Sequence, residues 1–170
     1  MKYFTKELWK RINSDNVLVC NNAMKEWEER TNEYVCAFNL IKEKFPRTFL
    51  KVYDQNEGFH DFELKSITFQ AKRKKHNCEL HLTRHNDHAI LFLSDLSVFS
   101  VDFPALSLEN CVGGKITWGY AELDYSSDHM FCISILFDYE NEMMLRAKKM
   151  KIKFKRQGLS CKHRLTIKSQ

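Results

Sequence analysis

Residues that interrupt regular structure are scarce in this sequence. It has 5 glycines and 2 prolines among 170 residues, too few for a collagen-like, linker-like or proline-rich chain. Runs of about 18 uncharged apolar residues, the length that a membrane-spanning helix needs, are also missing. The composition is instead that of a globular protein, with 44% hydrophobic and 13% aromatic residues. It excludes a disordered chain and predicts a single domain over residues 1–170.

Closely spaced cysteines are lacking as well. The chain has 6 cysteines, but no C-x-x-C pair occurs, which disfavours a zinc knuckle or a thioredoxin-like redox site. Cys36 and Cys132 fall within regular helical and strand patterns, where a thiol behaves as a small hydrophobe. The segment from Met1 to Glu7 carries charge too early for the apolar core of a signal peptide. We therefore expect reduced thiols and a cytoplasmic protein that does not span a membrane.

Motifs for catalysis and cofactor binding are missing too. The sequence has no G-x-G-x-x-G, Walker or H-E-x-x-H pattern, and no Ser, Cys or Lys stands in a nucleophile motif. The net charge of +5 is modest and arises from interleaved signs, so basicity alone does not indicate nucleic-acid binding. We expect no catalytic residue, no cofactor and no bound metal, and hence a non-enzymatic protein.

Helical periodicity dominates the first part of the chain, residues 1–46. A short helix is predicted over residues 1–13, with Thr5 or a near neighbour as its cap. A longer helix is predicted from about Asn22 to Phe45, capped by an asparagine at its start. Its seam repeats every three or four positions and comprises Met24, Trp27, Thr31, Tyr34, Phe38, Ile41 and Phe45. A connector with one helical turn is expected over residues 47–60.

Strand-like alternation replaces the helical pattern over residues 61–155. The first strand changes phase between Leu64 and Ile67, which predicts a bulge near Lys65. The third strand, over residues 89–99, has the same change of phase. The clearest hairpin is predicted over residues 130–155, with its turn at residues 139–141.

A weak internal repeat relates two of the predicted hairpins. Leu80 and Leu82 in the earlier hairpin correspond to Ile133 and Ile135 in the later one. Two such units are too few for a solenoid, so we expect them to belong to one antiparallel meander. The sequence thus predicts an α+β fold, in which two N-terminal helices pack on a bent antiparallel β-meander of about six strands. A basic tail follows at residues 156–170.

The last strand carries an unusual lysine stripe. Apolar side chains occupy one face of this strand, and four lysines occupy the other: Lys149, Lys151, Lys153 and Lys155. Lysines often protect exposed strands against edge-to-edge association. The alternative is a surface that follows a phosphate backbone, together with basic runs at residues 72–75 and 162–168. Aromatic residues interleaved for base stacking are expected to be missing from the lysine face, which weakens that alternative.

Two further groups are candidate binding residues. Trp118, Tyr120 and Glu122 alternate on a strand and are predicted to share one face, as a recognition patch or as aromatics under the long helix with Glu122 paired to a lysine. His60 and Asp61 open the sheet. An aspartate can orient a histidine for general-base chemistry. Neighbouring strand residues point to opposite faces, so we favour a polar junction in which Asp61 caps backbone amides and His60 fills the seam between helix and sheet.

A histidine-rich stretch invites a metal hypothesis. It contains His76, His81, His85 and His88. Residues four apart on a strand are about 13 Å apart, too far for His81 and His85 to bind one ion. His85 and His88, across a predicted turn, remain a weaker pair, and exposed turn histidines are the favoured interpretation.

The opening Met1-Lys-Tyr-Phe-Thr-Lys-Glu-Leu-Trp9, the Phe45-Pro46 junction before His60-Asp61, and the Trp118-x-Tyr120-x-Glu122 strand resemble an uncharacterised family of bacilli and related Gram-positive bacteria. That family has no assigned activity, so the resemblance implies a bacterial protein and brings no catalytic residues. The sheet portion is also similar to immunity-type proteins of bacterial toxin systems, whose role is to bind and block a partner toxin.

These observations predict a non-enzymatic intracellular binding protein with a protein partner, immunity-like in its role. The alternative is a nucleic-acid-binding module that uses the lysine stripe. Neither the partner nor the oligomeric state follows from the sequence.

Overall fold

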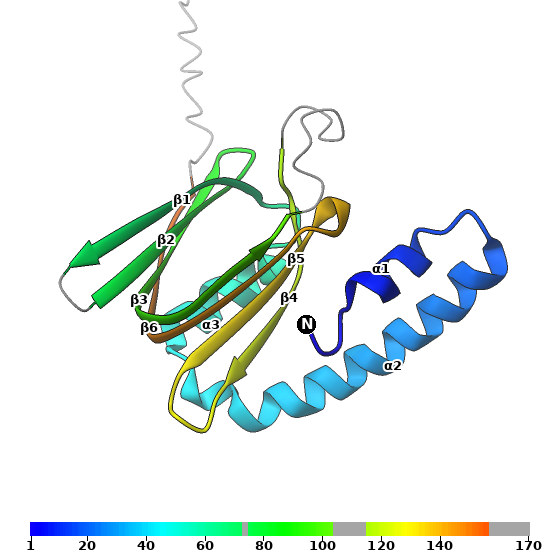
Figure 1. Ribbon diagram of the computed structural model, residues 1–170, viewed down its shortest axis with the longest axis horizontal. Coiled ribbons are helices and arrows are strands. Elements are labelled where there is room, and N and C mark those ends of the chain that lie inside the picture. Colours follow the sequence, from blue (N-terminus) through cyan, green and yellow to red (C-terminus); the bar gives the residue numbers. More distant parts are fainter. Residues whose placement is uncertain (73–74, 104–114, 157–170) are drawn as a thin grey trace, which may run out of the picture.

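The computed structural model describes residues 1–72, 75–103 and 115–156. This part of the chain forms three α-helices, short 3-10 helices and a six-stranded antiparallel sheet (Figure 1). The predicted α+β class, with helices before a six-stranded sheet, is confirmed. The expected basic tail beyond residue 156 and the basic run at 162–168 lie outside the described residues.

The first two helices begin at polar caps. In α1 (Lys6–Ile12), the Thr5 hydroxyl accepts a hydrogen bond from a first-turn amide, as predicted. In α2 (Val17–Ile41), the Asn16 side chain accepts from two first-turn amides. The predicted start at Asn22 is therefore too late, because Asn16 satisfies the helix amides one and a half turns earlier.

Most of the predicted seam of α2 faces the rest of the molecule. Trp27, Tyr34 and Phe38 each contact another aromatic ring. Met24 is 56% exposed and does not belong to the seam, and Ala23 beside it is fully buried. Ala23 lies between Cys20 and Trp27, which both contact residues of α1, so the seam begins at Ala23 and not at Met24.

A third helix occupies most of the segment that was expected to be a connector. After η1 (Lys42–Lys44), α3 (Arg47–Gln55) extends the predicted single turn to a full helix. Its Phe49 is 1% exposed. Burial of a phenylalanine side chain contributes roughly 1.5–3 kcal/mol, so this residue anchors α3 to the core.

The sheet consists of two three-stranded meanders. Its strands are β1 (Glu63–Lys72), β2 (Lys75–Arg84), β3 (Asp87–Asp102), β4 (Trp118–Tyr125), β5 (Phe131–Phe137) and β6 (Glu142–Arg156). Their spatial order is β1-β2-β3-β6-β5-β4. We call β1–β3 the first half and β4–β6 the second half. The two similar hairpins predicted from the repeat are β2–β3 and β5–β6, but the longest strands of the halves pair at the centre, so the strand order is not that of one sequential meander.

The two halves share further features. Each has a register shift near the start of its first strand, between Leu64 and Ser66 in β1 and between Trp118 and Tyr120 in β4. The shift in β1 confirms the predicted bulge near Lys65. The two edge strands also meet, through a bridge between Glu63 and Thr117 and flanking backbone hydrogen bonds of 2.7–2.9 Å. The sheet therefore curls until the starts of its edge strands touch, as Figure 1 shows.

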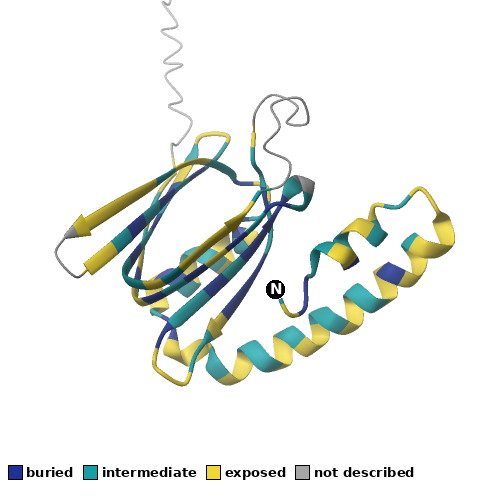
Figure 2. Cartoon of the chain, in the orientation of Figure 1, coloured by how far each residue is buried: buried dark blue, intermediate teal, exposed yellow. Residues whose placement is uncertain are grey.

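The curled sheet encloses the hydrophobic core, which defines its inner face. Side chains from all six strands and from the segment around α3 contribute to it. The most fully buried large residues are Trp118, Phe49, Phe59, Phe62, Phe137, Leu80, Leu82, Leu91, Leu93, Leu123, Ile133 and Ile135. Figure 2 shows buried positions alternating along the strands, whereas α2 is largely exposed or half-buried.

The central strands change phase together. On β3, Leu91 and Leu93 face the core, and Asp95 then adopts a φ of 57°. On β6, burial shifts from Ala147 to Met150, with two exposed lysines between them. This accounts for the change of phase in the third strand, because the sheet bends where β3 and β6 pair.

Candidate binding surface

The lysine stripe lies on the C-terminal part of β6, where this strand extends along β3 and adjoins the outer face of the first half. Beyond Ala147, β6 pairs only with β3 in the described part of the chain. The lysines stand opposite β3 residues, in the pairs Lys149–Ser94, Lys151–Phe92, Lys153–Ile90 and Lys155–His88. Directly paired residues point to the same face of an antiparallel sheet. All four lysines are exposed, so the predicted stripe forms a row of ammonium groups beside an outer face of β3 that carries both polar and apolar side chains.

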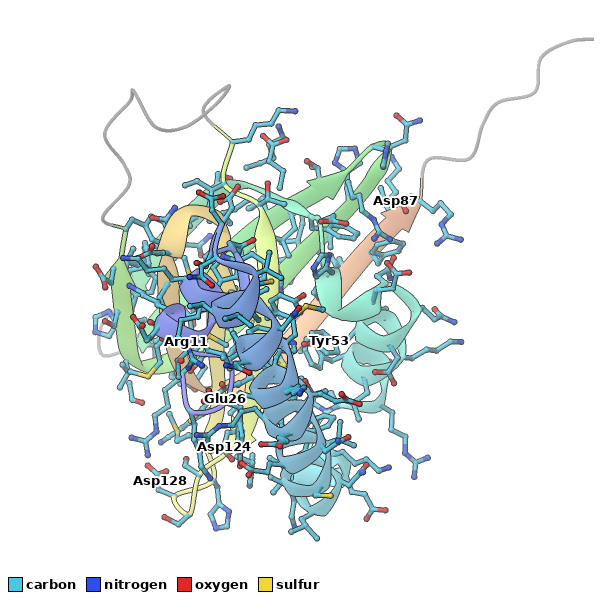
Figure 3. The ribbon with its side chains drawn as sticks, turned by 90° about the vertical axis from the view of Figure 1, so that its right-hand side faces the viewer. Arg11, Glu26, Tyr53, Asp87, Asp124 and Asp128 are labelled. Carbon is cyan, nitrogen blue, oxygen red and sulfur yellow. The ribbon has the colours of Figure 1, made fainter. Side chains whose placement is uncertain are left out.

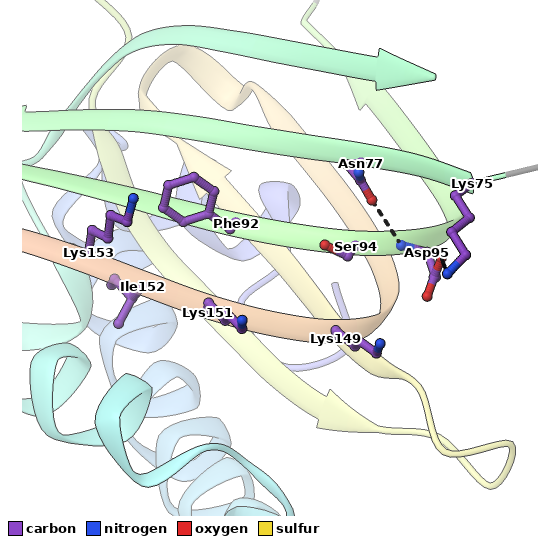
Figure 4. Close-up of a pocket in the computed structure, with 9 residues that line it drawn as sticks. All are labelled: Lys75, Asn77, Phe92, Ser94, Asp95, Lys149, Lys151, Ile152 and Lys153. Carbon is purple, nitrogen blue, oxygen red and sulfur yellow. Dashed lines mark hydrogen bonds and ion pairs between the residues drawn. The ribbon is translucent and has the colours of Figure 1, made fainter. Parts of the chain in front are cut away.

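A hollow of about 630 Å³ lies along this row (Figure 4). Three lysines of the stripe line one side of it, and residues of β2 and β3 form its floor and far wall. The lining residues are Lys75, Asn77, Phe92, Ser94, Asp95, Lys149, Lys151, Ile152 and Lys153. Lys155 belongs to the same face but lies outside the hollow.

Ion pairing differs between the two sides of the hollow. Lys75 Nζ lies 3.9 Å from Asp95 Oδ1, and the Asp95 amide donates a weak hydrogen bond of 3.4 Å to Asn77 Oδ1. In contrast, no described carboxylate lies within 4 Å of any of the four lysines of the stripe. Their charges are thus compensated by water and salt, and an anionic group can replace that solvent.

Phe92 contributes an aromatic surface inside the hollow. The Lys153 ammonium lies 5.0 Å from the centre of its ring, a cation–π arrangement that holds the lysine over the hollow. The expectation that aromatics are absent from this face is wrong, because Phe92 comes from β3 and not from the lysine-bearing strand. Glu79 and His81 of β2, whose side chains lie 3.5 Å apart, complete a face of mixed polarity.

The corresponding face of the second half is covered. Glu122 on β4 is 8% exposed, and its carboxylate accepts hydrogen bonds from the amides of Lys2, Tyr3 and Phe4 at 2.6–2.8 Å. The predicted pairing of Glu122 with a lysine of a neighbouring strand is wrong. Glu122 instead fixes the segment before α1 onto the sheet through three charge-assisted hydrogen bonds.

Aromatic packing extends this cover. The Tyr120 ring lies 4.6–5.7 Å from the rings of Phe4, Trp9 and Trp27. An ion pair between Arg11 and Glu26, at 2.7 Å, joins α1 to α2; both are labelled in Figure 3. The outer face of β4 is therefore buried under the N-terminal segment and the first two helices.

Trp118 does not share this face with Tyr120 and Glu122. It contacts Phe59 and Phe137 in the core. The register shift at Gly119 reverses the alternation, so Trp118 points inward and the next two candidates point outward. The predicted patch is thus divided, because Trp118 packs in the core whereas Tyr120 and Glu122 lie under the N-terminal segment and the helices.

Tyr34 of α2 adds a contact that the sequence did not indicate. Its hydroxyl accepts a 2.7 Å hydrogen bond from the Leu123 amide on the free edge of β4. Burial raises the pKa of Tyr34 to about 12, with the carboxylates of Glu122 and Asp124 adding to the rise and the Leu123 hydrogen bond opposing it. The helix seam predicted this residue to be packed, but not that it would cap a strand edge.

His60 and Asp61 do form a side-chain pair. His60 Nδ1 lies 3.1 Å from Asp61 Oδ1, because Asp61 has a φ of 65° and stands in a turn before β1 rather than in a strand. The inference from strand geometry is therefore wrong. The His60 ring packs 5.2 Å from Tyr120, as expected for the seam. The Asp61 carboxylate is 68% exposed and accepts no amide hydrogen bond among the described residues, so it is not a cap.

The remaining histidines do not assemble a metal centre in the described part of the chain. Within it, no group of three or more His, Cys, Asp or Glu side chains is placed to hold an ion. His85 and His88 instead line a separate hollow of about 480 Å³ beside Arg84 and Asp61. Lys65 and Lys115 at this hollow both approach the Glu63 carboxylate, unlike the lysines of the stripe.

Two broader expectations can be compared with the described residues. Cys20, Cys36, Cys78 and Cys132 are unpaired, while Cys111 and Cys161 lie outside this part of the chain. Burial raises the pKa of Cys78 to about 12, so its thiol stays protonated at neutral pH. No helix within residues 1–72, 75–103 or 115–156 has both the length and the apolar character to cross a bilayer.

Comparisons with known proteins add little to this geometry. No protein-family model matches the chain, and no curated protein matches it. A crystal structure of an uncharacterized protein from Neisseria gonorrhoeae is similar over 58% of this chain and 94% of that chain, with 19% identity and a TM-score of 0.38. A likeness at this level carries no argument about fold or function.

Proposed function

We propose that this chain is a non-enzymatic binding protein whose lysine-lined hollow receives an acidic surface of a partner protein. The observation that carries the proposal is a row of three lysines without described counter-ions on one side of a 630 Å³ hollow. Such a row attracts anions at a distance and gives specificity through charge complementarity. Membership of the family of bacilli, an immunity-like role and a cytoplasmic location are parts of this proposal.

The mixed polarity of the face supports a protein partner. Asp95 and Glu79 stand on the same face as the lysines, and acidic groups repel a continuous phosphate backbone. A protein surface can offer basic and acidic groups to match both. Phe92 provides an apolar contact of the kind that anchors protein interfaces.

A nucleic-acid partner is the second candidate, and Phe92 is the observation that favours it. A base can stack on this ring while phosphates contact the lysines. Binding of this kind loses affinity steeply with salt, roughly in proportion to the number of phosphates contacted. Nuclease treatment therefore separates it from the first candidate.

The proposal can be tested by affinity capture from a lysate of the source organism. We compare the wild-type chain with K149Q/K151Q/K153Q and with the matched control K10Q/K25Q/K51Q, which removes the same charge from exposed lysines of α1, α2 and α3. We expect a nuclease-resistant protein that the wild type and the control retain and the stripe variant loses. Equal retention by all three chains, or material that nuclease removes, contradicts the proposal.

A further inference from the structure

The spacing of the lysine row indicates the conformation of its partner. Side chains on one face of a strand repeat every second residue, about 6.8 Å apart. Lys149, Lys151 and Lys153 follow this repeat on a regular part of β6, which pairs with β3 without interruption. In an extended peptide, alternate residues have the same spacing. An extended segment can therefore place one carboxylate opposite each ammonium group.

A helical partner fits this row less well. Acidic residues on one helix face repeat at three and four positions, and the face drifts around the axis over successive turns. Three consecutive acidic residues in an extended segment also fit poorly, because neighbours point to opposite sides. Among acidic segments of equal charge, the lysine row thus distinguishes between sequence patterns.

The molecule already binds a segment before a helix on another part of the outer face of its sheet. Over the second half, the amides of residues 2–4 lie on β4 and are fixed by Glu122. The first half has the same three-stranded arrangement, and none of the described residues on its outer face or in the adjoining lysine stripe of β6 is buried. A segment that lies along the C-terminal part of β6 would cover the lysine stripe in the way that the N-terminal segment covers β4.

We infer that the lysine-lined hollow binds an extended segment of the partner protein in which acidic residues alternate with other residues. The inference rests on the proposed function, and it adds the conformation and sequence pattern of the partner. Each carboxylate faces one of Lys149, Lys151 and Lys153, while the residue between two carboxylates faces away from the row. Phe92, beneath Lys153, contacts the apolar part of the bound segment.

The test uses two labelled peptides of identical composition. One has the pattern Ser-Glu-Ser-Glu-Ser-Glu-Ser, and the other has the pattern Ser-Ser-Glu-Glu-Glu-Ser-Ser. Fluorescence anisotropy at low salt measures their affinity for the full chain. We expect the alternating peptide to bind at least about threefold more tightly, since each exposed ion pair that is lost weakens binding by a small factor.

The variants separate this inference from the proposed function. K149Q/K151Q/K153Q should bind both peptides equally weakly, whereas K10Q/K25Q/K51Q should keep the preference. Equal affinity of the wild type for both peptides, or no binding of either at millimolar concentration, overturns the inference. If the captured protein still depends on the stripe in that case, the proposed function stands and only the extended partner is excluded.

Discussion

Two parts of the outer face of the sheet differ in whether other segments of the chain cover them. On the second half, Glu122 and Tyr120 are covered by the N-terminal segment, α1 and α2. Beside it, the surface formed by β2, β3 and the C-terminal part of β6 presents exposed lysines and a hollow. The two surfaces belong to the same sheet and differ in the side chains that they carry. A sheet face that carries one buried carboxylate and aromatics binds the protein's own chain, whereas one that carries unpaired cations remains available.

Removal of the Glu122 carboxylate should have the largest effect, because this group holds the N-terminal segment on the outer face of β4. Glu122→Ala leaves the amides of residues 2–4 without their acceptor, and hydrogen bonds to charged groups contribute about 1.5–3 kcal/mol. We expect a loss of about 3 kcal/mol of unfolding free energy in urea titration. Glu28→Ala on the exposed side of α2 is the control and should change it by less than about 0.5 kcal/mol. Equal stability of the two variants would show that Glu122 does not fix the cover.

The bulge in β4 should respond strongly to a side chain. A Cβ atom at Gly119 would lie 3.0 Å from the Leu136 carbonyl oxygen, so Gly119→Ala forces the strands apart. We expect a loss of about 1–2 kcal/mol, measured by thermal unfolding. Lys65 occupies the corresponding bulge of β1 and is exposed, so Lys65→Ala should be neutral. An unchanged thermal stability of Gly119→Ala would mean that the bulge in β4, like the bulge in β1, accommodates a Cβ atom.

Tyr34→Phe tests how α2 is attached to the sheet. It removes the acceptor of the Leu123 amide and should cost about 1 kcal/mol at neutral pH. Because the folded pKa of Tyr34 is raised from 10.0 to about 12, the native state keeps the proton longer than the unfolded state. Stability is therefore full below pH 10 and is lost as pH rises towards about 12.

The alkaline loss should be smaller in Tyr34→Phe than in the wild type. It should not vanish, because burial also raises the pKa of Tyr53. Tyr125→Phe, at the end of β4, serves as the control and should retain the loss of the wild type. Superimposable curves of stability against pH for the wild type and Tyr34→Phe would contradict the assigned role of Tyr34.

Removal of the lysine row should have the smallest effect on the fold. K149Q/K151Q/K153Q removes exposed side chains without described ion pairs, so its unfolding free energy should match that of K10Q/K25Q/K51Q within about 0.5 kcal/mol. If the lysines serve only to protect the β6 edge, the stripe variant should self-associate. Light scattering distinguishes an edge-protecting role of the lysines from a binding role. We expect no more scattering from the stripe variant than from the control.

The regular parts of this molecule were accessible from the sequence, and the junctions were not. Alternation predicted the β5–β6 hairpin and the lysine face, because local periodicity reports which side of a strand is buried. The bulge at Lys65 followed from a visible change of phase in apolar residues. The bulge at Gly119 was missed because Trp118 and Tyr120 are both aromatic and preserve the alternation in the sequence.

Contacts between distant segments account for the other differences. Glu122 meets amides of residues 2–4, and nothing near it in the sequence signals this. Phe92 joins the lysines only because β3 pairs with β6 at that register. The His60–Asp61 pair depends on a positive φ that a non-glycine residue rarely adopts. These contacts can be predicted only when the strand order and the turn conformations are known. The sequence repeat indicated the strand order only in part.

The central claim is that the exposed face formed by the lysine stripe of β6 and the adjoining strands β2 and β3 is the binding surface. Acetylation of lysines in the free chain and in its complex with the captured partner, followed by mass spectrometry, tests it most directly. The account predicts protection of Lys149, Lys151 and Lys153 in the complex, with Lys10 and Lys25 acetylated equally in both states. Protection of Lys10 and Lys25 with an unprotected stripe would place the partner on the helices and contradict the account.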